Sequence, residues 1–82
     1  MSEKMEASFS VLIMSLGSSA LMAMGLAPDP QSGKIDKDKE LARFNIDLLV
    51  VLQSKTKGNL SSDEAQFLES LVTDLQMKYV SI

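Results

Sequence analysis

The feature that most constrains the fold is an uncharged segment near the amino terminus. From Ala7 to Pro28 the chain carries no charged side chain, and the first acid after it is Asp29. The large apolar residues of this segment fall on every side of a helix rather than along one stripe. A helix that is apolar all round belongs in a protein core or in a membrane. Three structures therefore compete: a membrane span, a secretion signal and a helix buried within a protein assembly.

A secretion signal fits this segment poorly. Such a signal begins with basic residues, whereas Glu3 and Glu6 outnumber Lys4 here. The small-residue cleavage site at 25–27 would place Pro28 directly after the cut. Removing the segment would also leave the remaining helices with nothing to pack on.

A membrane span is the stronger alternative, because the uncharged run reaches the length of about 20 residues that crosses a bilayer. However, serines and glycines lower its hydropathy, and no pair of basic residues flanks it on one side only. We therefore expect a buried helix over residues 6–25 and a cytoplasmic protein. Association with the inner membrane through this helix stays open as the alternative.

Two further helices follow a linker over residues 26–37, which contains Pro28 and Pro30. Asp38 is placed to cap a helix over 38–57, since its carboxylate can accept the free amides of the first turn. The pattern Ser61-Ser62-Asp63-Glu64 predicts a capping box at the start of a helix over 62–80. The short connection between the two predicts an antiparallel hairpin, in which Gly58 takes a positive φ to end the preceding helix.

The apolar residues of these two helices differ in how widely they spread. The last helix has one apolar stripe, formed by Leu68, Leu71, Val72, Leu75, Tyr79 and Ile82. The middle helix has a wider apolar arc, formed by Leu41, Phe44, Ile46, Leu48, Leu49, Val51 and Leu52. An arc this wide needs partners on two sides.

Several stretches of the chain together resemble a known family. They are KELARFNIDLLVVLQSKTKGNLSSDEAQFLESL and, upstream, SLGSSALMAMG and PDPQSGK. This combination resembles a small bacterial family catalogued as domain of unknown function 1844, from about Phe9 to Tyr79. The resemblance implies a short bacterial α-helical protein. It carries over no catalytic residue, because the family has no assigned activity.

The composition argues against several chemistries. The chain has no cysteine, which excludes a disulfide and a cysteine-based metal site or nucleophile, and no histidine, the commonest metal ligand and general base. Ser32-Gly33-Lys34 resembles the end of a phosphate loop, but Pro28 stands where that motif needs a glycine. The basic residues are scattered and the net charge is −3, so no nucleic-acid face emerges. We expect no catalytic, cofactor-binding or metal-binding residue, and no enzyme.

The remaining apolar surface predicts self-association. We expect one all-α domain over 1–82, in which the long apolar first helix packs against the helix hairpin within a helical-bundle homodimer. The small residues Ser15, Ser19 and Ala23 lie four apart on one face, which would allow two helices to cross closely. Asn45 lies within the apolar arc; if buried, it needs a hydrogen-bond partner, either its counterpart in a second chain or Ser15 or Ser18 of the first helix. The alternative is an asparagine at the edge of the arc that is wetted by solvent. The candidate interface residues are Leu12, Ser15, Leu16, Ser19, Ala23 and Asn45.

These observations favour an oligomeric interaction or structural module without catalytic activity. The expected partner is a second copy of the chain, with an unidentified protein as the further option, and no cofactor is expected. Two alternatives remain open: a small membrane-associated protein anchored by the first helix, and a carrier of an apolar ligand. The carrier would hold its ligand in a groove lined by Met14, Met22 and Met24.

Overall fold

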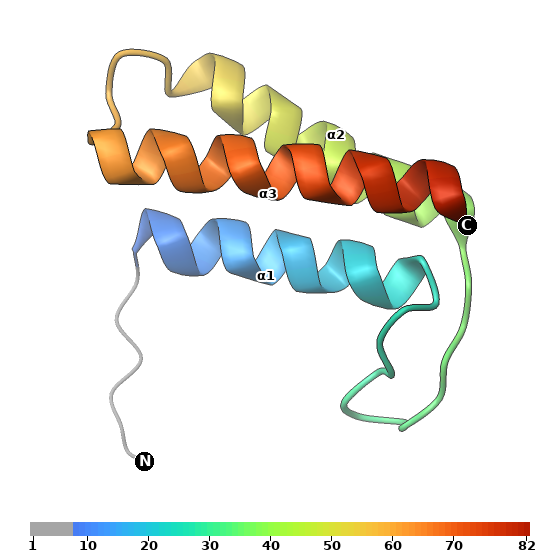
Figure 1. The fold of residues 1–82 in the computed structure, drawn as a ribbon. Coiled ribbons are helices and arrows are strands. Elements are labelled where there is room, and N and C mark those ends of the chain that lie inside the picture. Colours follow the sequence, from blue (N-terminus) through green and yellow to red (C-terminus); the bar gives the residue numbers. More distant parts are fainter. Residues whose placement is uncertain (1–7) are drawn as a thin grey trace.

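The computed structural model describes residues 8–82, and within them it contains three helices and no strand. The helices are α1 (Phe9–Ala23), α2 (Lys39–Lys55) and α3 (Ser62–Ser81). They lie beside one another, with α2 running opposite to α1 and α3, and each helix contacts the other two (Figure 1). The all-α fold expected from the sequence is confirmed.

The first helix is shorter than the expected segment 6–25. Ser8 is its N-cap, and the Ser8 hydroxyl accepts a hydrogen bond from the Val11 amide at 3.1 Å. The expected start at Glu6 lies outside the described residues. At the other end the helix stops at Ala23, because Gly25 takes a φ of 79° and the Leu26 amide turns back to the Leu21 carbonyl.

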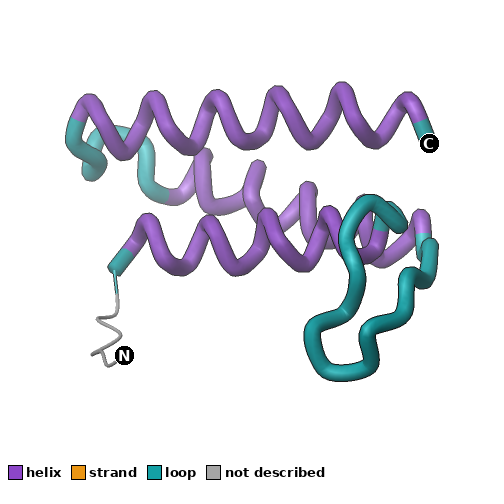
Figure 2. Tube along the Cα trace, turned by 60° about the horizontal axis from the view of Figure 1, so that its bottom comes forward, coloured by secondary structure: helices purple, strands orange, loops and turns teal. Residues whose placement is uncertain are grey.

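The linker between α1 and α2 projects from the helices as an open loop (Figure 2). Within it, the Asp29 carboxylate accepts the backbone amides of Gln31 and Ser32, which shapes the turn after Pro28. The loop closes where the Asp38 amide donates to the Ala23 carbonyl at 2.7 Å. This bond places the start of α2 beside the end of α1, and so the two helices pack antiparallel.

Local capping rules account for the boundaries of α2 and α3. The Asp38 side chain accepts the Leu41 amide, and Ser61 and Glu64 form the reciprocal capping box, as the sequence predicts. The middle helix ends at Lys55 instead of Lys57, because Thr56 caps it and donates its hydroxyl to the Leu52 carbonyl at 2.6 Å. Gly58 has a φ of 86°, which confirms the predicted left-handed conformation.

The core lies where the three helices meet. The stripe predicted for the last helix is buried or half-buried there, with Leu68, Val72 and Leu75 almost fully covered. The contributions of the other helices are Ile13, Gly17, Ala20 and Ala23 from α1, and Ala42, Asn45, Ile46 and Leu49 from α2. The inward side of α1 is therefore made mostly of small residues.

The turn at Gly58 gives a direct test of the hairpin connection. A β-carbon added to Gly58 would meet no atom within 4 Å, so any cost of substitution comes from the backbone conformation alone. We expect Gly58→Val to lower the free energy of unfolding by about 1–2 kcal/mol, since β-branched residues fit a positive φ poorly. Urea denaturation followed by circular dichroism measures the effect. Gly58→Asn is the matched control and should cost less, because asparagine tolerates this conformation.

Candidate functional site

The most unusual feature of the surface is its large apolar side chains on α1 and α2. In α1, Leu12 is 46% exposed and Met14 56% exposed, while the buried positions hold mainly glycine and alanine. In α2, Phe44 is 57% exposed and Val51 51% exposed. Large apolar residues at solvent and small ones inside reverse the usual distribution. A surface of this kind marks an interaction site.

The exposed residues of α2 form one stripe along the helix. Leu41, Phe44, Leu48 and Val51 follow one another at intervals of three and four residues, so they lie on the same side. Their side is the one turned away from α3, because Arg43 and Asp47 line a hollow with α3 on the other flank. The stripe therefore borders α1.

The matching stripe of α1 runs beside it. Ser19 and Met22 line a hollow of about 310 Å³ together with Leu41, which joins the two helices on one surface. Continuing back along α1 at the same spacing leads to Ser15 and Leu12. We call this surface the α1–α2 face; it consists of Leu12, Ser15, Ser19, Met22, Leu41, Phe44, Leu48 and Val51.

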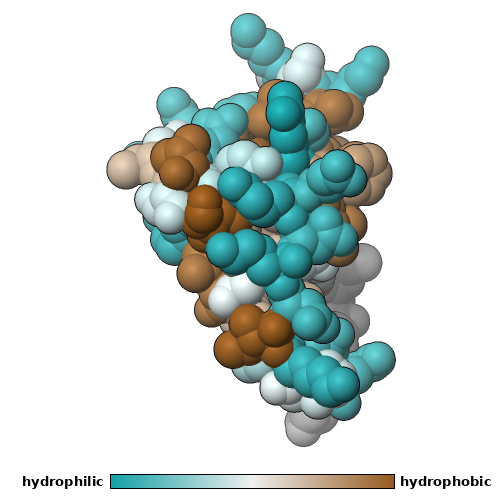
Figure 3. Space-filling view, turned by 90° about the vertical axis from the view of Figure 1, so that its right-hand side faces the viewer, coloured by the Kyte–Doolittle hydropathy of each residue, from teal (hydrophilic) through white to brown (hydrophobic). Residues whose placement is uncertain are grey.

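None of the residues in the α1–α2 face is charged. The charged side chains of α2 lie elsewhere: the Arg43 Nε lies 3.9 Å from the Asp47 carboxylate, and both are well exposed. The end of the molecule that carries the linker and the carboxyl terminus is more hydrophilic than the α1–α2 face. There, hydrophilic residues cover much of the surface and separate the apolar ones into patches (Figure 3).

The structure divides the interface residues expected from the sequence into two groups. Leu12 and Ser15 are exposed, and Leu16 and Ser19 are half-buried at the border with α2. Ala23 is buried in the core, together with Asn45. The small-residue stripe therefore does not stay on one side of α1, since its last member faces inward.

Asn45 is 7% exposed, and its Nδ2 donates to the Leu41 carbonyl of its own helix at 3.0 Å. This differs from the sequence-based expectation of a partner in a second chain or in Ser15 or Ser18. The reason is the wide apolar arc of α2, whose inner part already lies against α1. Asn45 is thus inside the protomer and is not part of the surface offered to another chain.

The three methionines proposed for a ligand groove do not share one. Met24 is fully buried, whereas Met22 lines the hollow beside Leu41. Met14 lies on another part of α1, in a shallow hollow with Val11, Ser15 and Ser18. They occupy three different environments.

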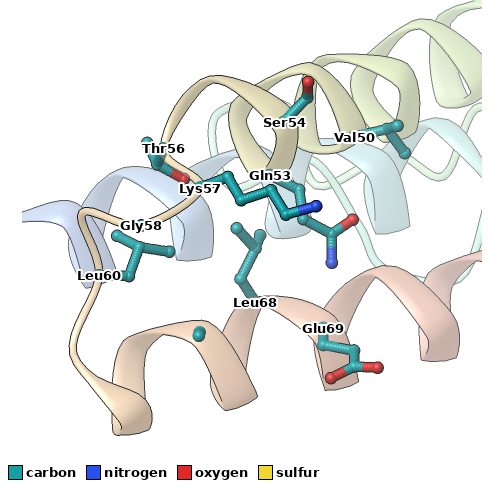
Figure 4. Close-up of a pocket in the computed structure, with 10 residues that line it drawn as sticks. Val50, Gln53, Ser54, Thr56, Lys57, Gly58, Leu60, Leu68 and Glu69 are labelled. Atoms are coloured by element: carbon teal, nitrogen blue, oxygen red, sulfur yellow. The ribbon is translucent and has the colours of Figure 1, made fainter.

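A separate hollow of about 540 Å³ lies where α2 and α3 diverge at the hairpin turn (Figure 4). Leu68 points into it from α3, and the Lys57 side chain extends across it toward Gln53. Its polar lining includes Gln53, Ser54, Lys57 and Glu69. Its apolar lining consists of Val50, Leu60, Ala65 and Leu68.

Two further findings bear on the kind of site. Within residues 8–82 no group of three or more acidic side chains comes together in a way that could hold a metal ion. None of the three helices combines the length and the hydropathy needed to cross a bilayer.

The α2 half of the face was recognised in the sequence only as part of a wide arc. The exposed residues from Leu41 to Val51 alternate in spacing of three and four, which is typical of a seam between helices. Core positions such as Ile46 and Leu49 follow their own helical spacing within the same arc. The core residues Ala42, Ile46 and Leu49 have the same spacing of three and four, so the spacing alone identifies two helical stripes but not which of them is buried.

The position of Asn45 leads to a specific expectation for Asn45→Leu. The change removes a buried amide that bonds only its own helix among the described residues, and it adds a better helix former. We expect the free energy of unfolding to stay equal or to rise by about 1 kcal/mol, with no change of oligomeric state. Denaturant titration and sedimentation measure both. A loss of more than about 1 kcal/mol in the free energy of unfolding would show that the Asn45 amide has a further hydrogen-bond partner.

Comparison with known proteins gives a family but no characterised relative. No curated protein and no solved structure matches the chain. A family model described as Domain of unknown function (DUF1844) matches residues 6–81, nearly the whole chain. The match spans all three helices and both sides of the α1–α2 face. The chain therefore belongs to the DUF1844 family.

Proposed function

We propose that the protein is a self-associating helical module, a homodimer built on the α1–α2 face, which acts by binding protein surfaces instead of by catalysis. The observation that carries this proposal is the exposure of large apolar side chains on an uncharged face of α1 and α2, while the buried positions of α1 hold mainly small residues. In an isolated chain these apolar side chains are exposed to water, which is unfavourable in free energy, and association would bury them.

The most exposed side chains of the α1–α2 face supply about half of the area that a stable dimer buries on each partner. Leu12, Leu41, Phe44 and Val51 together expose roughly 400 Å², if a fully exposed large side chain offers about 200 Å². A stable protein interface buries about 800 Å² on each partner. The neighbouring serines of α1 and the half-buried Leu48 and Met22 supply additional surface toward that figure.

The charge distribution favours a second copy of the chain as the partner that covers the α1–α2 face. The whole chain carries a net charge of −3, so two copies meet with less repulsion at an uncharged surface. The α1–α2 face is such a surface, and it brings no like charges together. Charged residues come close to the face only at its Leu41 end, where Asp29, Lys34, Asp36 and Asp38 line the hollow shared with Ser19 and Met22.

The same proposal places the assembly in the cytoplasm, because a second copy would cover the apolar face without any need for lipid. Cell fractionation checks this: the protein should remain in the supernatant without detergent. The carrier alternative gains no support, since Met14, Met22 and Met24 do not line a common groove.

Sedimentation equilibrium at micromolar concentration tests the dimer. We expect a dimer mass for the unmodified chain and a shift to monomer for Phe44→Asp, since burying an unpaired carboxylate in an apolar interface is costly. The milder Val51→Ser should raise the dissociation constant about tenfold, as expected for the loss of a buried aliphatic side chain.

Val80→Ser is the matched control for Val51→Ser. Val80 is 81% exposed and borders the Arg43 side of α2, away from the α1–α2 face. Its replacement should leave the dissociation constant unchanged. The proposed interface would be refuted if the folded chain sediments as a monomer at concentrations up to 100-fold above the micromolar range. Equal effects of Val51→Ser and Val80→Ser on the dissociation constant would also refute it.

A further inference from the structure

The exposed stripe of α2 has the pattern of a helix seam that lacks its partner. Leu41, Phe44, Leu48 and Val51 alternate in spacing of three and four, and Lys55 occupies the next place in the series. In helix pairs, residues with this spacing face the partner helix. The contacts of α2 with α1 and α3 use other positions, including Ala42, Ile46 and Leu49, so the seam stays open.

Resting on the proposed dimer, we infer that α2 of one chain pairs antiparallel with α2 of a second copy, about a twofold axis at Leu48. Leu41 and Lys55 are each seven residues from Leu48, so this axis brings Leu41 of one chain opposite Lys55 of the other. Phe44 then lies against the Val51–Leu52 part of the second copy. Every large side chain of the seam faces an apolar side chain or the stem of a lysine.

The charges at the two ends of the seam favour the antiparallel direction. The hollow beside Leu41 has a rim of three acids and one base, Asp29, Asp36, Asp38 and Lys34. Antiparallel pairing brings Lys55 of the second copy to this acidic rim, where its stem covers Leu41 and its ammonium group meets the carboxylates. Parallel pairing would place the two Lys55 residues together and the two acidic rims together, which is unfavourable.

Among the three acids, Asp36 is the one we assign to Lys55. The Asp38 carboxylate already accepts the Leu41 amide, and the Asp29 carboxylate accepts the amides of Gln31 and Ser32. Asp36 lies on the exposed part of the linker. The linker would thereby become part of the interface, because its return toward α1 carries Asp36 to the end of the seam.

The position of α1 agrees with the same axis. Met22 lies beside Leu41 and the two helices run antiparallel, so Ser15 lies level with Leu48. The axis therefore brings the Ser15 region of α1 over its counterpart in the second copy. A small side chain at this point lets the two α1 helices approach while the bulkier seam of α2 fills the space beside them.

Single cysteines provide the test, because the chain has none of its own. Leu48→Cys should be captured as a covalent dimer by mild oxidation or by a short bismaleimide, since the axis brings the two copies of residue 48 together. Ser54→Cys is the control on the same helix; it lines the hollow with α3 and should stay unlinked. Sedimentation of each reduced variant shows first whether it still dimerises.

A charge exchange tests the ends of the seam. Lys55→Asp and Asp36→Lys should each raise the dissociation constant about fivefold, and the double variant should recover most of the loss, as expected for an exposed ion pair counted twice in a symmetric dimer. The α2 pairing would be overturned, and the proposed dimer would stand, if Leu48→Cys chains form dimers normally but stay unlinked. The same holds if Leu48→Cys chains are linked only when they are mixed with Ser15→Cys chains. Equal losses in the single and double charge variants would overturn the assignment of Asp36. A monomeric unmodified chain would refute both proposals.

Discussion

The close approach of α1 to the other two helices depends on small residues on its inward side. Gly17, Ala20 and Ala23 are all buried, and a β-carbon on Gly17 would lie 3.3 Å from the methyl carbons of Leu71. Because these positions hold no bulk, the α1 backbone lies close to α3 and to α2. The same rotation of the helix leaves Leu12 and Met14 at the surface. The packing of the core and the apolar exterior thus have one cause.

The middle helix, α2, has large apolar residues on two of its sides. Its inner positions, such as Ile46 and Leu49, fill the core, whereas Leu41, Phe44 and Val51 are left at solvent. The wide arc in the sequence predicts this need for partners on two sides, and within one chain only one side is covered. The exposed stripe of Leu41, Phe44, Leu48 and Val51 has no polar residue to present to water, and in the proposed dimer a second helix layer would cover it.

The parts of the fold that follow from the sequence are those set by local chemistry. Asp38, Gly58 and the Ser61–Glu64 pair define the helix ends through bonds made within a few residues, and they occur as predicted. The core stripe of α3 is also predictable, because charged residues occupy its other side. The rotation of α1 is not, since a helix without charge gives no polar side from which to infer the buried one. This is why the expected stripe of Ser15, Ser19 and Ala23 is divided between surface and core.

In the proposed dimer, the exposed face would link the stability of the chain to its assembly. A domain of this length buries only about 60% of the surface of its unfolded chain, so its stability alone is marginal. Covering roughly 400 Å² on each of two chains is worth on the order of 20 kcal/mol before costs, against about 4–15 kcal/mol for the lost freedom of association. The difference is of the order of the 8 kcal/mol of a micromolar complex. Folding and dimerisation would then be coupled, and the midpoint of unfolding would rise with protein concentration because the second copy binds only the folded state.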